Sequence, residues 1–212
     1  TKALSLSFLQ SGMYMATFLF EEIVFGPVKS RRLGASLGIN LLPGNKKICN
    51  FNCIYCECGW TKETASDRKN LPTREVLRSH LKARLLEMQL LNEDLDTITF
   101  AGNGEPTIHP DFPGIIEDTI ALRDEIFPNV KIAVLSNATR LDDPQVISAL
   151  QKIEQPILKL DSAFQHTISS LNRPTAQHAP ENIIQNFEKF KGKFILQTLF
   201  VKGTNEGIAI DN

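Results

Sequence analysis

Apolar residues follow two alternating patterns along most of this chain: short continuous runs, and longer stretches in which they recur every three or four positions. Short runs are typical of strands, and the helical period of the longer stretches is typical of helices that bury one face. The predicted strands cover residues 23–25, 36–42, 97–101, 130–135, 157–160 and 194–201. The predicted helices follow Thr73 and cover residues 112–127, 144–153 and 181–191.

The helix after Thr73 has the clearest period. Thr73 has the hydroxyl group of an N-cap residue, and Glu75 places a carboxylate in the first turn. The apolar side chains recur on one face, which we expect to pack into the core and to take no part in chemistry. These residues are Leu77, Leu81, Leu85, Met88 and Leu91.

The alternation of strands and helices predicts an α/β fold built from βαβ units, with a parallel sheet and right-handed crossovers. A turn at Gly26–Pro27 is expected to end the first strand, and Pro43–Gly44 to end the second. The pattern alone does not distinguish a curled partial barrel from a flat, doubly wound sheet. With 212 residues, 42% hydrophobic and 22% charged, one ordinary globular domain is expected.

The two ends of the chain differ from this regular pattern. Residues 1–22 are interpreted as an N-terminal extension, and residues 23–212 as the core domain. The extension has no charge between Lys2 and Glu21, but polar residues interrupt it, so we expect no membrane anchor. The chain begins with Thr, and Met15 has the position of a natural start. Because the last predicted strand lies close to Asn212, we expect the C-terminal part of the core domain to be missing.

The formal net charge of −1 argues against a general attraction to nucleic acid or to an anionic membrane. One local basic group is expected near the face of the domain that carries the cysteine-rich segment at residues 49–56. It is either a solvated surface or a clamp for phosphate or carboxylate groups. Its members are Lys29, Arg31, Arg32, Lys46 and Lys47.

All four cysteines fall within ten residues, which indicates a reducing compartment, the cytoplasm, and a single metal function. Cys49, Cys53 and Cys56 have the spacing C-x3-C-x2-C, so three thiolates on one loop can bind one metal centre and leave it one ligand short. A metal centre with an open coordination position implies catalytic chemistry at that centre. A structural zinc site would need Cys58 or His80 as its fourth ligand, and a disulfide is disfavoured on so tight a loop. A [4Fe-4S] cluster with one free iron is the third interpretation.

Glycine and short polar residues follow three of the predicted strands. The turn at residues 102–106 has the sequence GNGEP, which exposes backbone donors and acceptors beside the carboxylate of Glu105. Ser136–Asn137 and Asp161–Ser162 end two later strands. Turns and helix caps use the same residue types, so none of these groups is a site by itself.

The cysteine spacing, Tyr55 in the aromatic position before the third cysteine, and Asn103–Gly104–Glu105 in the place of a G-G-E motif together resemble the radical S-adenosylmethionine (SAM) superfamily. This resemblance implies a partial (βα)6 barrel, with a [4Fe-4S] cluster on Cys49, Cys53 and Cys56 and SAM at the free iron. The SAM contacts that it implies are Tyr55, Gly102, Asn103, Gly104, Glu105, Ser136, Asn137, Asp161 and Ser162. Residues 203–206 are a further candidate for the adenine, and Cys58 is interpreted as a bystander thiol.

Residues 26–34, 36–40 and 102–107 look like the branch known as wyosine-synthase-like Fe-S oxidoreductases. Archaeal tRNA-modifying synthases of that branch carry a second cluster on additional cysteines, and no cysteine precedes Cys49 here. Wyosine synthesis itself is therefore not expected. The resemblance implies reductive cleavage of SAM to a 5′-deoxyadenosyl radical, an unknown substrate such as a tRNA base or a small molecule, and a flavodoxin or ferredoxin as electron donor.

Two alternatives remain open from the residues. One is a non-catalytic Fe-S or zinc module, which does not explain why Gly104–Glu105 falls at the end of the strand that follows the cysteine loop. The other is an activating enzyme that places a glycyl-type radical on a partner protein, for which no docking feature is evident in the sequence.

Overall fold

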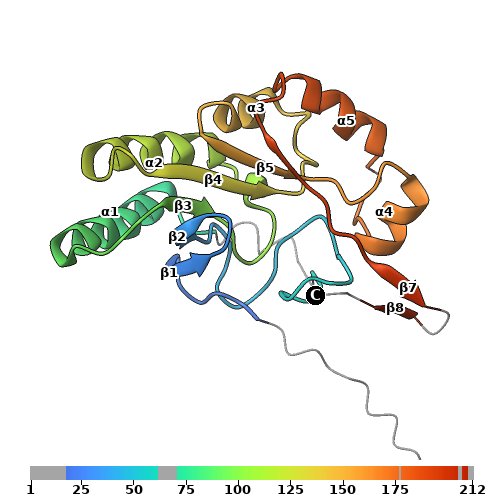
Figure 1. The fold of residues 1–212 in the computed structure, drawn as a ribbon, viewed down its shortest axis with the longest axis horizontal. Coiled ribbons are helices and arrows are strands. Elements are labelled where there is room, and N and C mark those ends of the chain that lie inside the picture. Colours follow the sequence, from blue (N-terminus) through green and yellow to red (C-terminus); the bar gives the residue numbers. More distant parts are fainter. Residues whose placement is uncertain (1–17, 62–70, 177, 205–206, 210–212) are drawn as a thin grey trace, which may run out of the picture.

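The computed structural model describes residues 18–61, 71–176, 178–204 and 207–209, and its central feature is a six-stranded sheet (Figure 1). The strands lie in chain order from β1 to β6. β1 pairs with β2 in antiparallel fashion, and β2 to β6 are parallel. The bounds are β1 Val24–Ser30, β2 Gly34–Ile39, β3 Thr97–Phe100, β4 Lys131–Ser136, β5 Gln155–Lys159 and β6 Ile195–Gln197.

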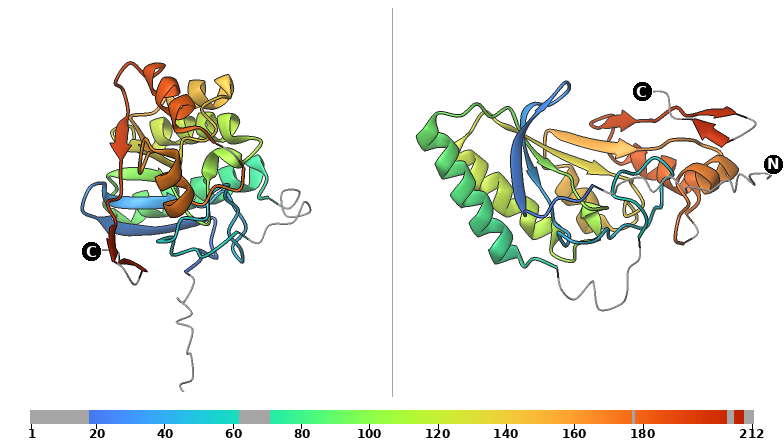
Figure 2. Two further views of the ribbon diagram at one scale, coloured as in Figure 1. Left: turned by 90° about the vertical axis from the view of Figure 1, so that its right-hand side faces the viewer. Right: turned by 90° about the horizontal axis from the view of Figure 1, so that it is seen from below.

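Helices cover one face of the sheet, as Figures 1 and 2 show. Parallel strands in chain order, joined by crossovers of one hand, place their helices on the same side. The sheet is therefore a partial barrel, which confirms the fold expected from the sequence. The bounds are α1 Arg74–Leu91, 3-10 helix η2 Pro106–Ile108, α2 Phe112–Ile126, α3 Pro144–Leu150, α4 Gln165–Leu171 and α5 Pro180–Glu188, with a separate hairpin of β7 Lys202–Thr204 and β8 Gly207–Ala209.

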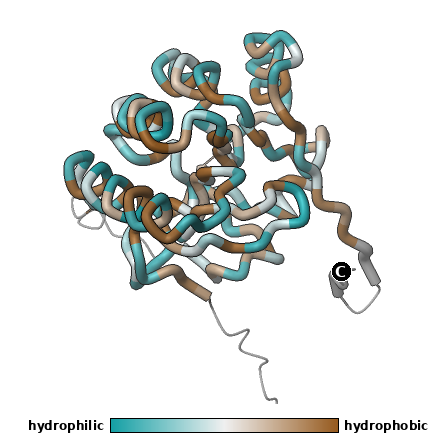
Figure 3. Tube along the Cα trace, turned by 60° about the vertical axis from the view of Figure 1, so that its left-hand side comes forward, coloured by the Kyte–Doolittle hydropathy of each residue, from teal (hydrophilic) through white to brown (hydrophobic). Residues whose placement is uncertain are grey.

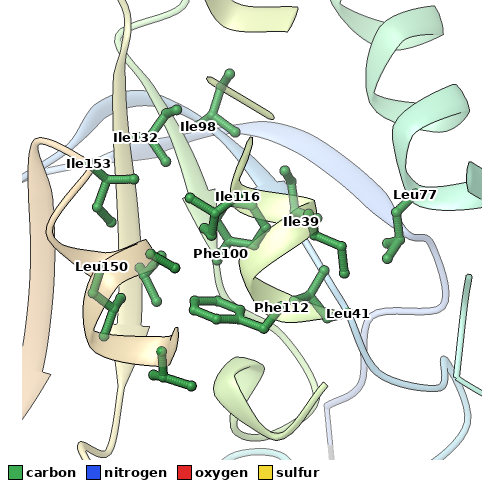
Figure 4. Packing of buried hydrophobic residues seen from close by; sticks show 14 of the residues in the cluster. Ile39, Leu41, Leu77, Ile98, Phe100, Phe112, Ile116, Ile132, Leu150 and Ile153 are labelled. Atoms are coloured by element: carbon green, nitrogen blue, oxygen red, sulfur yellow. The ribbon is translucent and has the colours of Figure 1, made fainter. Parts of the chain in front are cut away.

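The core lies between the sheet and these helices. Hydrophobic and hydrophilic residues alternate along the helices, as an amphipathic layer requires (Figure 3). Side chains from both layers meet in the middle, where the rings of Phe100 in β3 and Phe112 in α2 have centroids 6.4 Å apart (Figure 4). The predicted apolar face of α1 is buried except for Leu91, which is 58% exposed because the helix ends there, at a left-handed C-cap on Asn92.

The turn predicted at Gly26–Pro27 is wrong. β1 continues through these residues, and the pairing register with β2 shifts between Phe25 and Val28, so that an irregular bulge takes the place of a turn. The ring of Phe25 packs directly on Gly38, where an added Cβ would lie 2.1 Å from the ring. The chain reverses instead at residues 31–33.

Residues 18–22, the described part of the expected N-terminal extension, contact β1 and the turn after β3. The Phe20 N–H donates to Asn103 Oδ1 at 2.9 Å, and Asn103 Nδ2 donates to the Phe20 carbonyl at 2.8 Å. The ring of Phe20 also stacks on that of Phe25, at 3.7 Å between centroids. Met15, the expected start, lies outside the described residues. Within the described ranges, no helix is long and apolar enough to cross a membrane.

Candidate active site

A cleft of about 280 Å³ lies at the carboxyl ends of the parallel strands, where barrel folds carry their chemistry. All four cysteines line it, together with residues at the ends of β3, β4, β5 and β6. The lining consists of Lys47, Cys49, Phe51, Cys53, Cys56, Cys58, Ala101, Gly102, Gly104, Glu105, Leu135, Ser136, Asn137, Lys159 and Gln197.

A larger cleft, of about 640 Å³, lies at the opposite edge, beside the amino ends of β5 and β6. Its lining includes Gln151, Glu154 and Lys191 but no cysteine. The smaller cleft is the candidate active site because it contains the potential metal ligands.

The cysteine loop is joined on one side to the glycine-rich turn after β3. The Ile48 N–H donates to the Asn103 carbonyl at 2.9 Å, and the Glu105 N–H donates to the Ile48 carbonyl at 3.1 Å. Gly104 has a φ of +139°, and a Cβ there would lie 1.8 Å from the Ile48 carbonyl oxygen. Gly102 has a φ of +148°, and its Cβ would lie 2.5 Å from Asn40 Oδ1. Both positions therefore require glycine.

The other side of the loop is joined to the end of α4. The Asn52 N–H donates to the Asn172 carbonyl at 2.8 Å, and the Ile54 N–H donates to the Leu171 carbonyl at 2.9 Å. α4 was not predicted, because its seven residues bury a single side chain, Ile168, and show no clear period. The cysteine loop is thus held between two segments that are far apart in the sequence.

Nitrogen donors approach two of the three motif sulfurs. Asn172 Nδ2 lies 3.3 Å from Cys53 Sγ, and Asn137 Nδ2 lies 3.7 Å from Cys49 Sγ. Such donors favour the thiolate form, which is the form that binds metal. Burial, and then the nearby charge of Glu105, raise the pKa of Cys49 to about 12 in the metal-free chain. A bound metal would displace that proton.

The pKa of Cys56 is shifted in the opposite direction from that of Cys49. A hydrogen bond from the Cys58 thiol lowers the pKa of Cys56 to about 5 against the effect of burial, and the ammonium of Lys47 adds to the shift. The sulfur of Cys58 also lies 3.5 Å from the Gly102 carbonyl oxygen. The side chain of Cys58 thus lies where the cysteine loop approaches the turn after β3.

The donor set fits a cluster bound by three cysteines: three soft sulfur ligands on one loop, with nitrogen donors at two of the sulfurs. Among the residues that the structure describes, no three Cys, His, Asp or Glu side chains lie close enough to hold a single metal ion. His80, considered above as a zinc ligand, lies in α1 and does not line the cleft. Its Nδ1 is 2.8 Å from the carbonyl of Val76.

Glu105 is the buried acid of the site, with 2% of its surface exposed. Its Oε1 accepts hydrogen bonds from the Thr107 hydroxyl at 2.6 Å and the Ser136 hydroxyl at 2.9 Å, and its Oε2 accepts from the Asn137 N–H at 2.7 Å. Burial raises the pKa of Glu105, and these hydrogen bonds oppose that rise. Ser136 and Asn137 thus hold the carboxylate in place, and their predicted contacts with SAM stay predictions.

Four of the predicted SAM-binding residues do not line the cleft: Tyr55, Asn103, Asp161 and Ser162. The side chain of Asn103 turns toward Phe20 and Pro43. The side chain of Asp161 is buried and accepts hydrogen bonds from the Tyr55 hydroxyl, from Asn172 Nδ2 at 2.6 Å and from the Leu199 N–H at 3.0 Å. Burial raises the pKa of Tyr55. Ser162 Oγ accepts from the Phe164 N–H at 3.0 Å, before α4.

Lys159 and Gln197 line the cleft and were missed. They are the last residues of β5 and β6, so the strand-end rule that selected Ser136 could have found them. Lys159 Nζ lies 3.5 Å from Asp161 Oδ2 and 4.1 Å from the centre of the Tyr55 ring. In the further adenine candidate, Gly203 and Thr204 belong to β7, and residues 205–206 lie outside the described ranges.

The expected basic group divides into two parts. Lys29, Arg31 and Arg32 lie at the reversal between β1 and β2, beside the amino end of β2 and away from the cleft, so their expected place on the active face is wrong. Lys47 lines the cleft and is 4% exposed, so the solvated-surface interpretation is wrong for Lys47.

The model of the Radical SAM superfamily matches residues 47–207, which include the cysteine loop and every strand from β3 onward except the end of β8. The chain therefore belongs to the radical SAM superfamily.

The chain is also similar to curated relatives in sequence and to a solved structure in fold. A UPF0026 protein of Helicobacter pylori is 30% identical over 187 residues, which are 87% of this chain and 58% of the relative. A UPF0026 protein of Synechocystis is 34% identical over 184 residues, 84% of this chain and 64% of the relative. The chain thus spans about three-fifths of these relatives. Native anSMEcpe with bound AdoMet has a similar fold, with a TM-score of 0.53 and 20% identity over 78% of this chain and 44% of that chain.

Proposed function

We propose that this chain is the catalytic domain of a radical SAM enzyme of the oxidoreductase type, with a [4Fe-4S] cluster on Cys49, Cys53 and Cys56 and SAM in the same cleft. The observation that carries the proposal is that these three thiols share one cleft with Gly102, Gly104 and Glu105. When bound, the reduced cluster and SAM supply reductive cleavage of the sulfonium and a 5′-deoxyadenosyl radical that abstracts hydrogen from a substrate.

The protein's own part is to position these groups and to limit the access of water. The turn after β3 holds the cysteine loop through two backbone hydrogen bonds with Ile48. Glu105 would supply the negative partner for the ammonium group of SAM, and Ser136 and Asn137 fix the orientation of its carboxylate. Because Glu105 and Asn137 are buried, an ion pair formed there is weakly screened by solvent.

The cellular setting is also part of the proposal. Four free thiols on one loop suit a reducing compartment, and we assign the protein to the cytoplasm on that ground. A flavodoxin or ferredoxin would supply the electron. A tRNA base or a small molecule would be the substrate.

The test is anaerobic reconstitution with iron and sulfide, followed by metal analysis and an assay for 5′-deoxyadenosine with dithionite and SAM. We expect about four iron ions per chain in the parent protein, together with formation of deoxyadenosine. Cys49→Ala, Cys53→Ala and Cys56→Ala should each lose most of the iron and all of the product.

Cys58→Ala is the matched control, because Cys58 lies on the same loop but outside the motif. This variant should keep the iron content of the parent. Tightly bound zinc in place of iron, or equal metal loss in Cys58→Ala, would contradict the proposal and favour a non-catalytic metal module. A full cluster that never yields deoxyadenosine would contradict the SAM-cleaving part alone.

A further inference from the structure

Lys47 is a buried cation at the edge of the cysteine loop. It is 4% exposed and lines the cleft, two residues before Cys49. Its Nζ donates to the Gly59 carbonyl at 2.9 Å. In the described part of the chain, no carboxylate lies within ion-pair distance of this ammonium group. The second lysine of the cleft, Lys159, differs because Asp161 lies 3.5 Å away.

A buried ammonium group loses its hydration and needs an anionic partner to compensate for that loss. Lys47 shares the lining of the cleft with the thiols of all four cysteines, and the N–H of its partner Gly59 donates to the Cys56 carbonyl at 3.0 Å. Metal-bound cysteines are thiolates, so the motif cysteines would supply negative charge close to the ammonium group of Lys47 when they are ligands.

We propose that Lys47 is a positioning residue that places a fixed positive charge against the thiolates of the cluster and so raises the cluster's reduction potential. This inference rests on the proposed function only in requiring the cluster, and it does not require SAM cleavage. Reduction adds one electron from an external reductant and transfers no proton, so the cluster becomes more negative. A positive charge in a site of low dielectric constant stabilises the reduced form more than the oxidised form.

The competing explanation is structural: Lys47 would only fasten the loop through its hydrogen bond to the Gly59 carbonyl. Three variants separate the two explanations. Lys47→Met keeps the unbranched shape and most of the length of the side chain without the charge, Lys47→Arg keeps the charge, and Lys47→Gln keeps a neutral hydrogen-bond donor. Lys131→Met is the matched control, because it removes one positive charge from an exposed position at the amino end of β4.

The experiment is an anaerobic redox titration of the cluster-loaded protein without SAM, followed by electron paramagnetic resonance, with iron content measured for every variant. We expect Lys47→Met and Lys47→Gln to lower the equilibrium constant for reduction at least tenfold, a shift of about 59 mV for one electron. Lys47→Arg should return close to the parent value, and Lys131→Met should not differ from the parent.

Equal potentials in the parent and in Lys47→Met at equal iron content would overturn the inference and leave the proposed function intact. If Lys47→Met fails to load, Lys47→Gln decides, and an unshifted potential there overturns the inference too. A parent chain that takes up no cluster overturns both proposals. A loaded parent that does not cleave SAM contradicts the proposed function while the potentials still decide the role of Lys47.

Discussion

The side-chain nitrogen of Asn172 lies 3.3 Å from Cys53 Sγ, and the same nitrogen lies 3.0 Å from the Tyr55 hydroxyl and 2.6 Å from Asp161 Oδ2. One amide thus connects a motif cysteine to a buried carboxylate at the end of β5. Because Asn172 follows α4 directly, the position of this short helix determines how the cysteine loop is supported.

The first prediction concerns this amide. Asn172→Ala should lower the free energy of unfolding of the metal-free protein by about 1–3 kcal/mol, because it removes a hydrogen bond to the buried carboxylate of Asp161, whose Oδ2 then keeps only the Tyr55 hydroxyl as a hydrogen-bond donor at this side. Urea unfolding measures the change. Asn182→Ala, in an exposed position on α5, is the control and should change stability by less than about 0.5 kcal/mol. Equal stability of Asn172→Ala and the parent would show that the amide does not support the loop.

The second prediction concerns the close approach at Gly104. Gly104→Ala should destabilise the metal-free protein by about 3 kcal/mol or more, because the new methyl group meets the Ile48 carbonyl at 1.8 Å and the backbone is strained. Gly192→Ala is the control: its φ is also positive, at +77°, but nothing lies within 4 Å of the new Cβ. Gly192→Ala should lower the free energy of unfolding by about 1–2 kcal/mol, because it adds backbone strain without a steric clash. Similar costs at both positions, read from denaturant midpoints, would contradict the close approach.

The third prediction tests the core of the barrel. Leu85→Ala should cost about 2–5 kcal/mol of unfolding free energy, because Leu85 is fully buried on the inner face of α1. Its neighbour Leu86 is 44% exposed, so Leu86→Ala should cost less than about 1 kcal/mol. Thermal and urea unfolding of the pair measure the difference. The reverse order would mean that α1 presents another face to the sheet.

The fourth prediction concerns pH. Burial lowers the pKa of His109 below its ordinary value of 6.5. Its Nδ1 accepts from the Asp111 N–H at 3.1 Å, and its Nε2 lies 2.9 Å from the carbonyl of Pro72, an arrangement that fits the neutral ring with its proton on Nε2. As the pH falls below about 6.5, the unfolded chain binds a proton that the folded His109 resists. The stability due to this group is therefore complete above pH 6.5 and is lost as the pH falls.

The measurement is urea unfolding at pH 7.5 and 5.5 for the parent and for His109→Gln. The parent should lose more stability between these two pH values than the variant does. Subtracting the variant removes the contribution of Glu105, whose raised pKa acts with the opposite sign because burial favours its protonated form. An equal loss in both proteins would show that His109 titrates normally.

The sequence predicts the fold well where a periodic pattern is long, and poorly where tertiary contacts decide. The stripe from Leu77 to Met88 predicts the buried face of α1, and all four of its residues are in the core. The path of β1 through Gly26–Pro27 could not be predicted, because Phe25 packing on Gly38 is a contact between strands. α4 lacks a periodic stripe, so neither the helix nor Asn172 was evident.

In the candidate active site, too, the sequence motifs could be predicted, whereas the features that depend on tertiary contacts could not. The spacing of the cysteines and the turn at Gly102–Glu105 identify segments that the structure brings to one cleft. Residue type alone could not show that Asp161 is enclosed by hydrogen bonds while Lys159, two residues earlier, reaches the cleft. Side chains two apart on a strand point to the same face, but Asp161 lies beyond the end of β5, where the alternation no longer applies. The burial of Lys47 likewise depends on Gly59 from the far side of the loop.

The most direct test of the central claim is the electron paramagnetic resonance spectrum of the reconstituted, dithionite-reduced protein with and without SAM. If the cluster on Cys49, Cys53 and Cys56 has an iron open to SAM, the reduced [4Fe-4S] signal should change on addition of SAM and be absent from Cys53→Ala. A reduced cluster whose spectrum is the same with and without SAM would contradict the account.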